Sequence, residues 1–199
     1  MLYNEHNLKV AKIASRGGIK PVLECVLFTK DKSVATDSFR LLEVSVPKNA
    51  KAGEFPKVQG HSVMQGVKPF LARAREVEKI KIPKKAKLPI LEHFGIKHVD
   101  NHHAEFLSVD KDGESVQITN ALRVDDQFPD YEKIFPTGKP VAEVDVNAFF
   151  LSEILEIMGG MNKHDARITI KIYGEGKPVV VVAGNDNQSA RAMIMPVVR

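Results

Sequence analysis

Residues 22–46 read VLECVLFTKDKSVATDSFRLLEVSV and contain two apolar runs that a polar turn separates. The runs, at residues 22–29 and 33–46, are rich in Val, Leu and Phe, which favour β-strands. Lys30-Asp31-Lys32 is typical of the turn between them. The stretch therefore predicts two strands that follow each other directly along the chain.

A helix is expected directly before these strands, at residues 6–16. Its apolar positions, which are spaced to face a core, are Leu8, Ala11 and Ile13. Its basic positions, which repeat at three and four residues along the outer side, are Lys9, Lys12 and Arg16. Gly17 and Gly18 are typical of a helix end.

The same order, one helix and then antiparallel strands, is predicted twice more. A short helix is expected at residues 88–94, between Pro89 and the stop Gly95, with strands at 104–109, 115–120 and 121–127. The clearest helix is expected from Asn147 to about Met158, with strands at 167–173, 177–183 and 190–197. Three such units predict the α+β class.

The domain organisation follows from the spacing of these units. Residues 1–136 are expected to form one domain and residues 137–199 a smaller second one. Residues 47–83, rich in Lys and Pro, form a long connection that is interpreted as partly mobile or as an inserted loop.

Composition excludes several classes of protein. The chain has 199 residues, of which 43% are apolar and 27% charged, as in ordinary globular proteins. The single cysteine, Cys25, excludes a fold built on internal disulfides. There is no apolar run of the ~20 residues that a spanning helix needs, and no secretory signal. We therefore expect a soluble, cytoplasmic protein.

The net charge of +4 hides a strong asymmetry along the chain. Residues 1–100 contain 19 Lys and Arg against 10 Asp and Glu, whereas residues 101–199 contain 10 against 15. A basic half is suited to nucleic-acid phosphates, although a solvated lysine-rich surface gives the same count.

Nothing in the sequence requires an enzyme or a cofactor. One cluster offers potential metal ligands, namely His93, His98, Asp100, His102, His103 and Glu105. Its spacing matches no metal motif, so a metal-dependent enzyme is only a remote alternative. Cys25 lies in an apolar run and is interpreted as a packed thiol rather than a nucleophile.

Three short motifs carry a resemblance to a known family. Residues 33–41, SVATDSFRL, resemble the Ala-Thr-Asp-Gly-His-Arg-Leu segment of the bacterial DNA polymerase III beta sliding clamp. Phe-Pro-Asp-Tyr at residues 128–131 resembles that clamp's linker between its second and third domains, and Met195-Pro196 is similar to its carboxyl-terminal Met-Pro. Residues 5–136 resemble the middle domain, and residues 141–199 resemble the second half of the last domain.

The resemblance implies two binding surfaces. In the family, a hydrophobic pocket captures short peptides from polymerases, the clamp loader and repair proteins. The matching positions here are Leu23, Thr36, Arg40, Leu41, Pro129, Ile134, Met193, Met195, Pro196 and Val197. Ser38-Phe39 replaces Gly-His, so Phe39 is expected to reshape the pocket. The positions that match DNA-facing cations are Lys9, Lys12, Arg16, Lys84, Lys85 and Lys87.

The sequence therefore indicates a clamp-like processivity factor that associates with duplex DNA and tethers replication or repair proteins. Twelve helix-plus-strands units close the family's ring, so four chains of three units would supply them. The alternative is a peptide-binding adaptor that does not encircle DNA, because the third helix shows Ser152, Glu153 and Glu156 on its outer face. A homo-oligomer without a membrane partner is expected in the first case.

Overall fold

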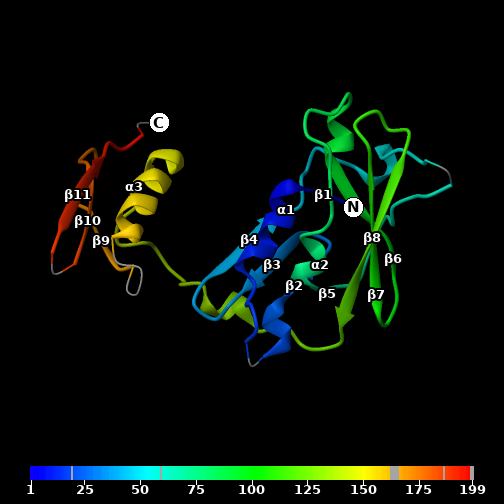
Figure 1. The fold of residues 1–199 in the computed structure, drawn as a ribbon, viewed down its shortest axis with the longest axis horizontal. Coiled ribbons are helices and arrows are strands. Elements are labelled where there is room, and N and C mark those ends of the chain that lie inside the picture. The colour runs from blue at the N-terminus through cyan, green and yellow to red at the C-terminus, as the bar shows by residue number, and fades with distance from the viewer. Residues whose placement is uncertain (19, 59, 162–165, 186, 198–199) are drawn as a thin grey trace. The chain divides into compact units, whose positions relative to one another are not determined.

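The computed structural model describes residues 1–199 except 19, 59, 162–165, 186 and 198–199. The chain forms two compact units, Met1–Tyr131 and Glu132–Arg199, named unit 1 and unit 2. The division falls a few residues before the expected boundary between residues 136 and 137. Both units combine helix with antiparallel sheet (Figure 1), which confirms the α+β class.

The first predicted helix exists but is shorter and changes its type. α1, Glu5–Lys9, continues as the 3₁₀ helix η1, Val10–Ile13, and so ends before the predicted Arg16. It begins after Asn4, whose side-chain oxygen accepts hydrogen bonds from the backbone N–H groups of two residues in the first turn. This cap satisfies donors that a helix start leaves without partners.

The predicted helix at residues 88–94 is wrong. Pro89–Glu92 forms only the 3₁₀ turn η4, and His93–Val99 is strand β6. Gly95 does not end a helix but lies in this strand, where an added Cβ would come within 2.2 Å of Val63 Cγ1. Glycine stands there because the side chain of Val63 occupies the space.

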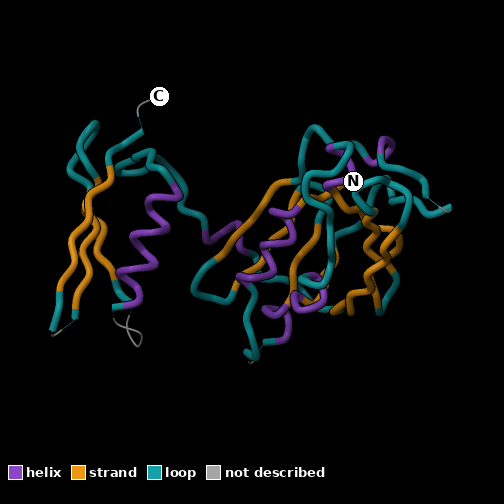
Figure 2. The backbone as a smooth tube through the Cα atoms, turned by 45° about the horizontal axis from the view of Figure 1, so that its top comes forward, coloured by secondary structure: helices purple, strands orange, loops and turns teal. Residues whose placement is uncertain are grey.

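The second helix lies instead inside the stretch that was expected to be a connection. α2, Ala74–Val77, follows strand β5, Phe70–Arg73, and the 3₁₀ helix η3 lies earlier, at Ala52–Glu54. α2 contacts η1, and the two lie side by side across one face of the sheet (Figure 1, Figure 2). Residues 47–83 are therefore an integral part of unit 1.

Unit 1 contains one eight-stranded antiparallel sheet in the order β1-β6-β7-β8-β5-β2-β3-β4. The strands not yet given are β1 (Leu2–Asn4), β2 (Cys25–Phe28), β3 (Lys32–Thr36), β4 (Leu41–Ser45), β7 (His103–Val109) and β8 (Val116–Val124). Residues 33–46, expected as one run, form β3 and β4 because a tight turn interrupts them. Residues 115–127, expected as two strands, form the single strand β8.

A cluster of aromatic rings fills the core of unit 1. Phe28 is fully buried, and its ring centroid lies 5.3 Å from that of Tyr3, 5.5 Å from Phe70 and 5.2 Å from Phe106. These residues come from β1, β2, β5 and β7, so the Phe28 ring contacts strands from both halves of the sheet. The Tyr3 hydroxyl donates to the backbone oxygen of Thr29 at 2.8 Å, which satisfies the buried polar group.

Unit 2 agrees closely with its prediction. α3, Ala148–Gly160, starts after the cap Asn147 and continues to Gly160, just beyond the predicted end. It packs on a three-stranded sheet in the order β11-β10-β9 (Figure 2), and the strands are β9 (Ile168–Lys171), β10 (Val179–Gly184) and β11 (Ser189–Ile194). Met158, Val181 and Ile194 lie at the centre of this small core.

Among the described residues, no helix has the length and hydrophobicity that crossing a membrane requires.

Candidate peptide-binding and DNA-facing surfaces

A hydrogen-bonded turn between β3 and β4 presents Phe39. Asp37 Oδ1 accepts from the N–H groups of Phe39 and Arg40, both at 3.0 Å. Ser38 adopts φ +79°, an uncommon conformation for a residue other than glycine. At the tip of the turn, Phe39 is 97% exposed. The structure thus offers an unprotected aromatic ring where the resembling segment has histidine.

Thr36 and Arg40, which were expected to contact a peptide, help to hold this turn. The Thr36 hydroxyl donates to the Arg40 backbone oxygen at 2.9 Å and accepts from Ser38 N–H at 3.2 Å. Arg40 Nε donates to Asp37 Oδ2 at 2.9 Å. Partial desolvation alone would raise the pKa of Asp37, but these backbone and guanidinium hydrogen bonds lower it. The Arg40 side chain is otherwise exposed to solvent.

Leu23 and Leu41 differ in accessibility. Leu23 lies in the 3₁₀ helix η2, Pro21–Glu24, and is only 8% exposed within a satellite cluster that also contains Cys25 and Leu71. Leu41, at the start of β4, is half-buried. Leu23 is therefore first a packing residue, and its truncation is expected to destabilise the unit as well as change the surface.

The linker aromatics pack back onto unit 1. Phe128 and Tyr131 meet edge to face with ring centroids 5.9 Å apart, and Lys32 Nζ lies 5.2 Å from the Tyr131 ring centroid. Pro129, between them, is exposed and accepts from Tyr131 N–H at 2.8 Å. Phe128 touches the satellite cluster that contains Leu23. Phe128 and Tyr131 are therefore part of the packing of unit 1.

The remaining candidate peptide-binding residues belong to unit 2. Ile134 lies in the 3₁₀ helix η5, Tyr131–Ile134, and is exposed. The exposed apolar side chains at and after the end of β11 are Met193, Met195 and Val197. Pro196 is half-buried, and Val197 N–H donates to the Asp145 backbone oxygen at 2.8 Å. The tail is docked, yet it keeps its methionines available to a ligand.

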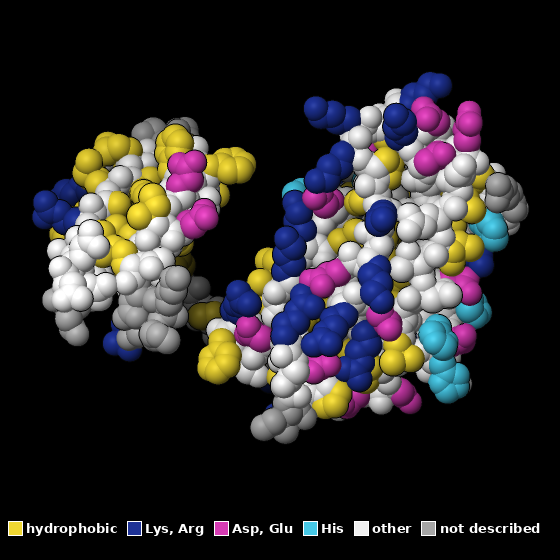
Figure 3. Space-filling model, viewed as in Figure 1, with side chains coloured by type: hydrophobic (Ala, Val, Ile, Leu, Met, Phe, Trp, Pro, Cys, Tyr) yellow, Lys and Arg dark blue, Asp and Glu magenta, His cyan; other side chains and the backbone are white. Residues whose placement is uncertain are grey.

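The predicted cations of unit 1 gather at α1 and its surroundings. Glu5 lies between Lys9 and Lys84, with Nζ to Oε1 distances of 3.1 and 3.4 Å. Hydrogen bonding by Lys9 is the largest cause that lowers the pKa of Glu5. Arg16, which follows η1, is paired with Glu78, just after α2. Figure 3 shows Lys and Arg side chains over the face that α1 and α2 cover, with acidic groups between them.

Lys84, Lys85 and Lys87 were predicted near a second helix, but they lie in the loop before η4. The Lys87 N–H donates to the Lys111 backbone oxygen at 3.0 Å, and Lys85 adopts φ +55°. The contact of Lys84 with Glu5 nevertheless brings this loop beside α1.

Sequence reasoning missed two cations, because it missed α2. Arg75 lies on this helix, Lys79 lies two residues after its end, and both are exposed. Charged and apolar residues alternate in LARAREVEKI, residues 71–80, which is the pattern of a strand, so the sequence carries no helical period that could have located this four-residue helix. On α3 the outer face is acidic as expected, because Glu153 and Glu156 are exposed.

The histidine cluster is spread over the hairpin of β6 and β7. Asp100 accepts from the N–H groups of His102 and His103, both at 2.7 Å, and so caps the hairpin turn. His98 Nε2 lies 3.9 Å from Asp100 Oδ2. Within the part of the chain that is described, no three His, Cys, Asp or Glu side chains are grouped as a metal site requires. Cys25 is buried, and burial raises the pKa of its thiol to about 11.

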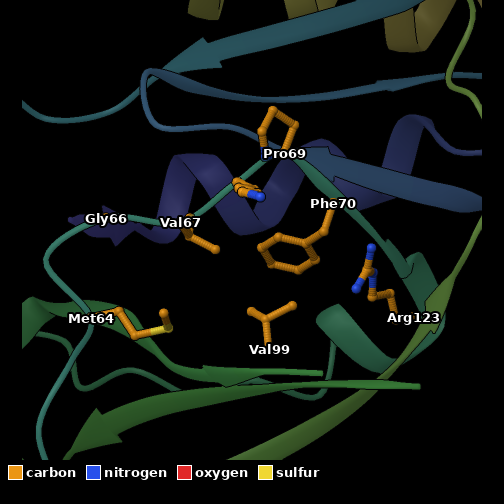
Figure 4. Close-up of a pocket in the computed structure, with 8 residues that line it drawn as sticks. Met64, Gly66, Val67, Pro69, Phe70, Val99 and Arg123 are labelled. Carbon is orange, nitrogen blue, oxygen red and sulfur yellow. The ribbon is translucent and has the colours of Figure 1, made fainter. Parts of the chain in front are cut away.

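A cavity of about 290 Å³ lies elsewhere in unit 1 (Figure 4). Its lining includes Met64, Val67 and Val99, and Arg123 lies at one side. The Arg123 Nη1 donates to the Asp100 backbone oxygen at 2.7 Å, whereas its buried Nε has no hydrogen-bond partner among the described residues. None of the residues predicted for either surface lines this cavity.

The sequence matches no protein-family model and no curated protein sequence. Solved structures do match. A DNA polymerase sliding clamp from Pseudomonas aeruginosa, solved with a ligand, aligns with a TM-score of 0.64 and 16% identity, over 98% of this chain and 50% of its own. The beta subunit from the DNA polymerase of Streptococcus pyogenes aligns with a TM-score of 0.64 and 13% identity, over 100% of this chain and 50% of its own. The Helicobacter pylori beta clamp in complex with carprofen aligns with a TM-score of 0.64 and 15% identity, over 98% of this chain and 48% of its own.

The chain spans about half the length of the structures that it matches. The alignment includes nearly every residue, so both units contribute to it. The chain therefore has the fold of the bacterial DNA polymerase III beta sliding clamps, as the three short motifs indicated.

Proposed function

We propose that this protein is a non-catalytic, clamp-like factor that associates with duplex DNA and holds replication or repair proteins on it. The observation that carries the proposal is the match of the whole chain to sliding clamps. The basic surface formed by α1, η1 and α2 supports it, because exposed Lys and Arg side chains bind phosphates without reading bases.

The proposal is tested with a fluorescein-labelled duplex of about 30 base pairs by fluorescence anisotropy. Binding is expected at low salt, equally for a second duplex of unrelated sequence, and its affinity should fall steeply as salt rises. Absence of binding at ~20 mM salt would contradict the DNA role.

The peptide role is proposed for the exposed tail of unit 2. Met195→Ala is expected to weaken the binding of a fluorescein-labelled peptide with adjacent Leu and Phe anchors about fivefold or more, because an apolar anchor of the peptide loses its contact. Met195 is the better test than Leu23, since truncation of the buried Leu23 also affects folding. Fluorescence polarisation measures the affinity.

Met64→Ala is the matched control, because Met64 is an exposed methionine of unit 1 outside the predicted residues. It should bind the peptide as the unchanged protein does. Equal affinity for Met195→Ala and the unchanged protein would refute the peptide role of the tail.

The second candidate is an adaptor that binds peptides but does not encircle DNA. The acidic outer face of α3 favours it, because Glu153 and Glu156 repel phosphates. This candidate predicts peptide binding in polarisation together with no DNA binding in anisotropy.

A further inference from the structure

In unit 1, the strand that precedes each helix pairs with the first strand that follows the other helix. β1 precedes α1 and pairs with β6, which follows α2. β5 precedes α2 and pairs with β2, which follows η1. On its other side β5 pairs with β8, the last strand of its own half. Unit 1 is therefore built from two halves that exchange strands.

Unit 2 has the elements of one such half. A segment without regular secondary structure, residues 141–146, precedes α3, and β9, β10 and β11 follow it. The hydrogen bond from Val197 N–H to the Asp145 oxygen places this segment beside the chain that leaves β11, as β5 lies beside β8. Among the described residues, the segment has no strand on its other side, and β9 is the open edge of the sheet.

Apolar side chains remain uncovered where a second half would pack. Ile170 of β9 lies opposite the fully buried Val181 of β10, so it points to the same face of the sheet, yet it is 50% exposed. Along α3, Phe150 and Ile157 are two turns apart and form a side stripe beyond the core-facing residues. They are 59% and 72% exposed.

We propose that unit 2 binds unit 2 of a second copy of this chain around a two-fold axis, with residues 141–146 of each copy pairing with β9 of the other. The two segments and six strands would form an eight-stranded sheet, as in unit 1. The two α3 helices would lie side by side, as η1 and α2 do, and would cover Ile157 and Ile170.

A second copy fits because this surface is self-complementary. Each copy offers both the open β9 edge and the segment 141–146 that would pair with such an edge, which is the condition for a two-fold interface. Apolar Val144 and Val146 alternate with acidic Glu143 and Asp145, the pattern of a half-buried strand. The proposal rests on strand pairing and is independent of DNA or peptide binding.

Light scattering coupled to size-exclusion chromatography tests the proposal on the full chain at ~50 µM. The unchanged protein is expected to have at least twice the mass of one 22.1 kDa chain. Ile157→Glu places a charge between the two α3 helices of the proposed dimer and is expected to halve the measured mass. Phe149→Glu, at an exposed position on the outer side of α3, is the matched control and should keep the full mass.

A second variant tests the strand exchange without a change on α3. The Asp145 oxygen points to the chain's own tail, so the N–H of the neighbouring Val144 points to the open side, because strand residues alternate in direction. Val144→Pro removes this donor and should also halve the mass, with an unchanged circular-dichroism spectrum. A monomeric unchanged protein, or full mass in both Ile157→Glu and Val144→Pro, would overturn the proposal.

Discussion

Replacement of Lys12 and Lys79 together by glutamate is expected to weaken binding to duplex DNA at least about tenfold at ~100 mM salt. Both side chains are exposed, one on η1 and one two residues after the end of α2, and these two helices are in contact. Neither makes an ion pair with a described residue, whereas Arg16 is already engaged by Glu78. Loss of two phosphate contacts should also reduce the slope of log affinity against log salt by about two.

The matched control replaces Lys57 and Lys177 by glutamate. Both are exposed and lie outside α1, η1 and α2. Each double variant lowers the net charge of +4 by the same amount, so a difference between them reports position rather than total charge. Anisotropy measures both in parallel. Equal weakening by the two pairs would mean that the helix face is not the DNA-binding surface.

Phe28→Ala is expected to lower the free energy of unfolding by about 3–5 kcal/mol, the largest effect of any single truncation proposed for this protein. The ring is fully buried and contacts the rings of Tyr3, Phe70 and Phe106. Its removal leaves a cavity between strands from both halves of the sheet. Urea unfolding followed by circular dichroism measures the change.

Such a loss is comparable to the total stability of many domains, so Phe28→Leu provides a milder second variant. Phe28→Leu should fold and lower the free energy of unfolding by less than Phe28→Ala, because the isobutyl group fills part of the cavity. Phe39→Ala is the matched control, since this ring is almost fully exposed and its loss should change stability by less than ~0.5 kcal/mol. A Phe28→Ala protein as stable as Phe39→Ala would contradict the described core.

The sequence predicted the long elements well and the short ones poorly. α3 was predictable because thirteen residues carry a clear apolar face after an asparagine cap. α2 is only four residues long, too short for a helical period to be visible. Pro89 and Gly95 are typical helix start and end residues and so indicated a helix. In the structure Pro89 begins a 3₁₀ turn, and Gly95 lies in a strand where it leaves space for the Val63 side chain.

The residues of the candidate surfaces remain predictions, and their contacts within the fold could not be read from the sequence. Sequence patterns placed Lys9 on an outer helix face, yet they could not show that Lys84, 75 positions later, reaches the same Glu5 carboxylate. Thr36 and Arg40 were expected to meet a ligand. The conformation of their turn directs the Thr36 hydroxyl and Arg40 Nε to bonds within it, which only the folded backbone defines.

The most direct test of the clamp role is retention on DNA whose ends are closed. The protein is mixed with a linear duplex that carries biotin at both ends, streptavidin is added, and the salt is raised to ~500 mM to weaken phosphate contacts. A clamp-like factor that surrounds DNA should stay on the blocked duplex and be released when a restriction enzyme cuts it. Equally fast loss from blocked and free-ended DNA would contradict the account.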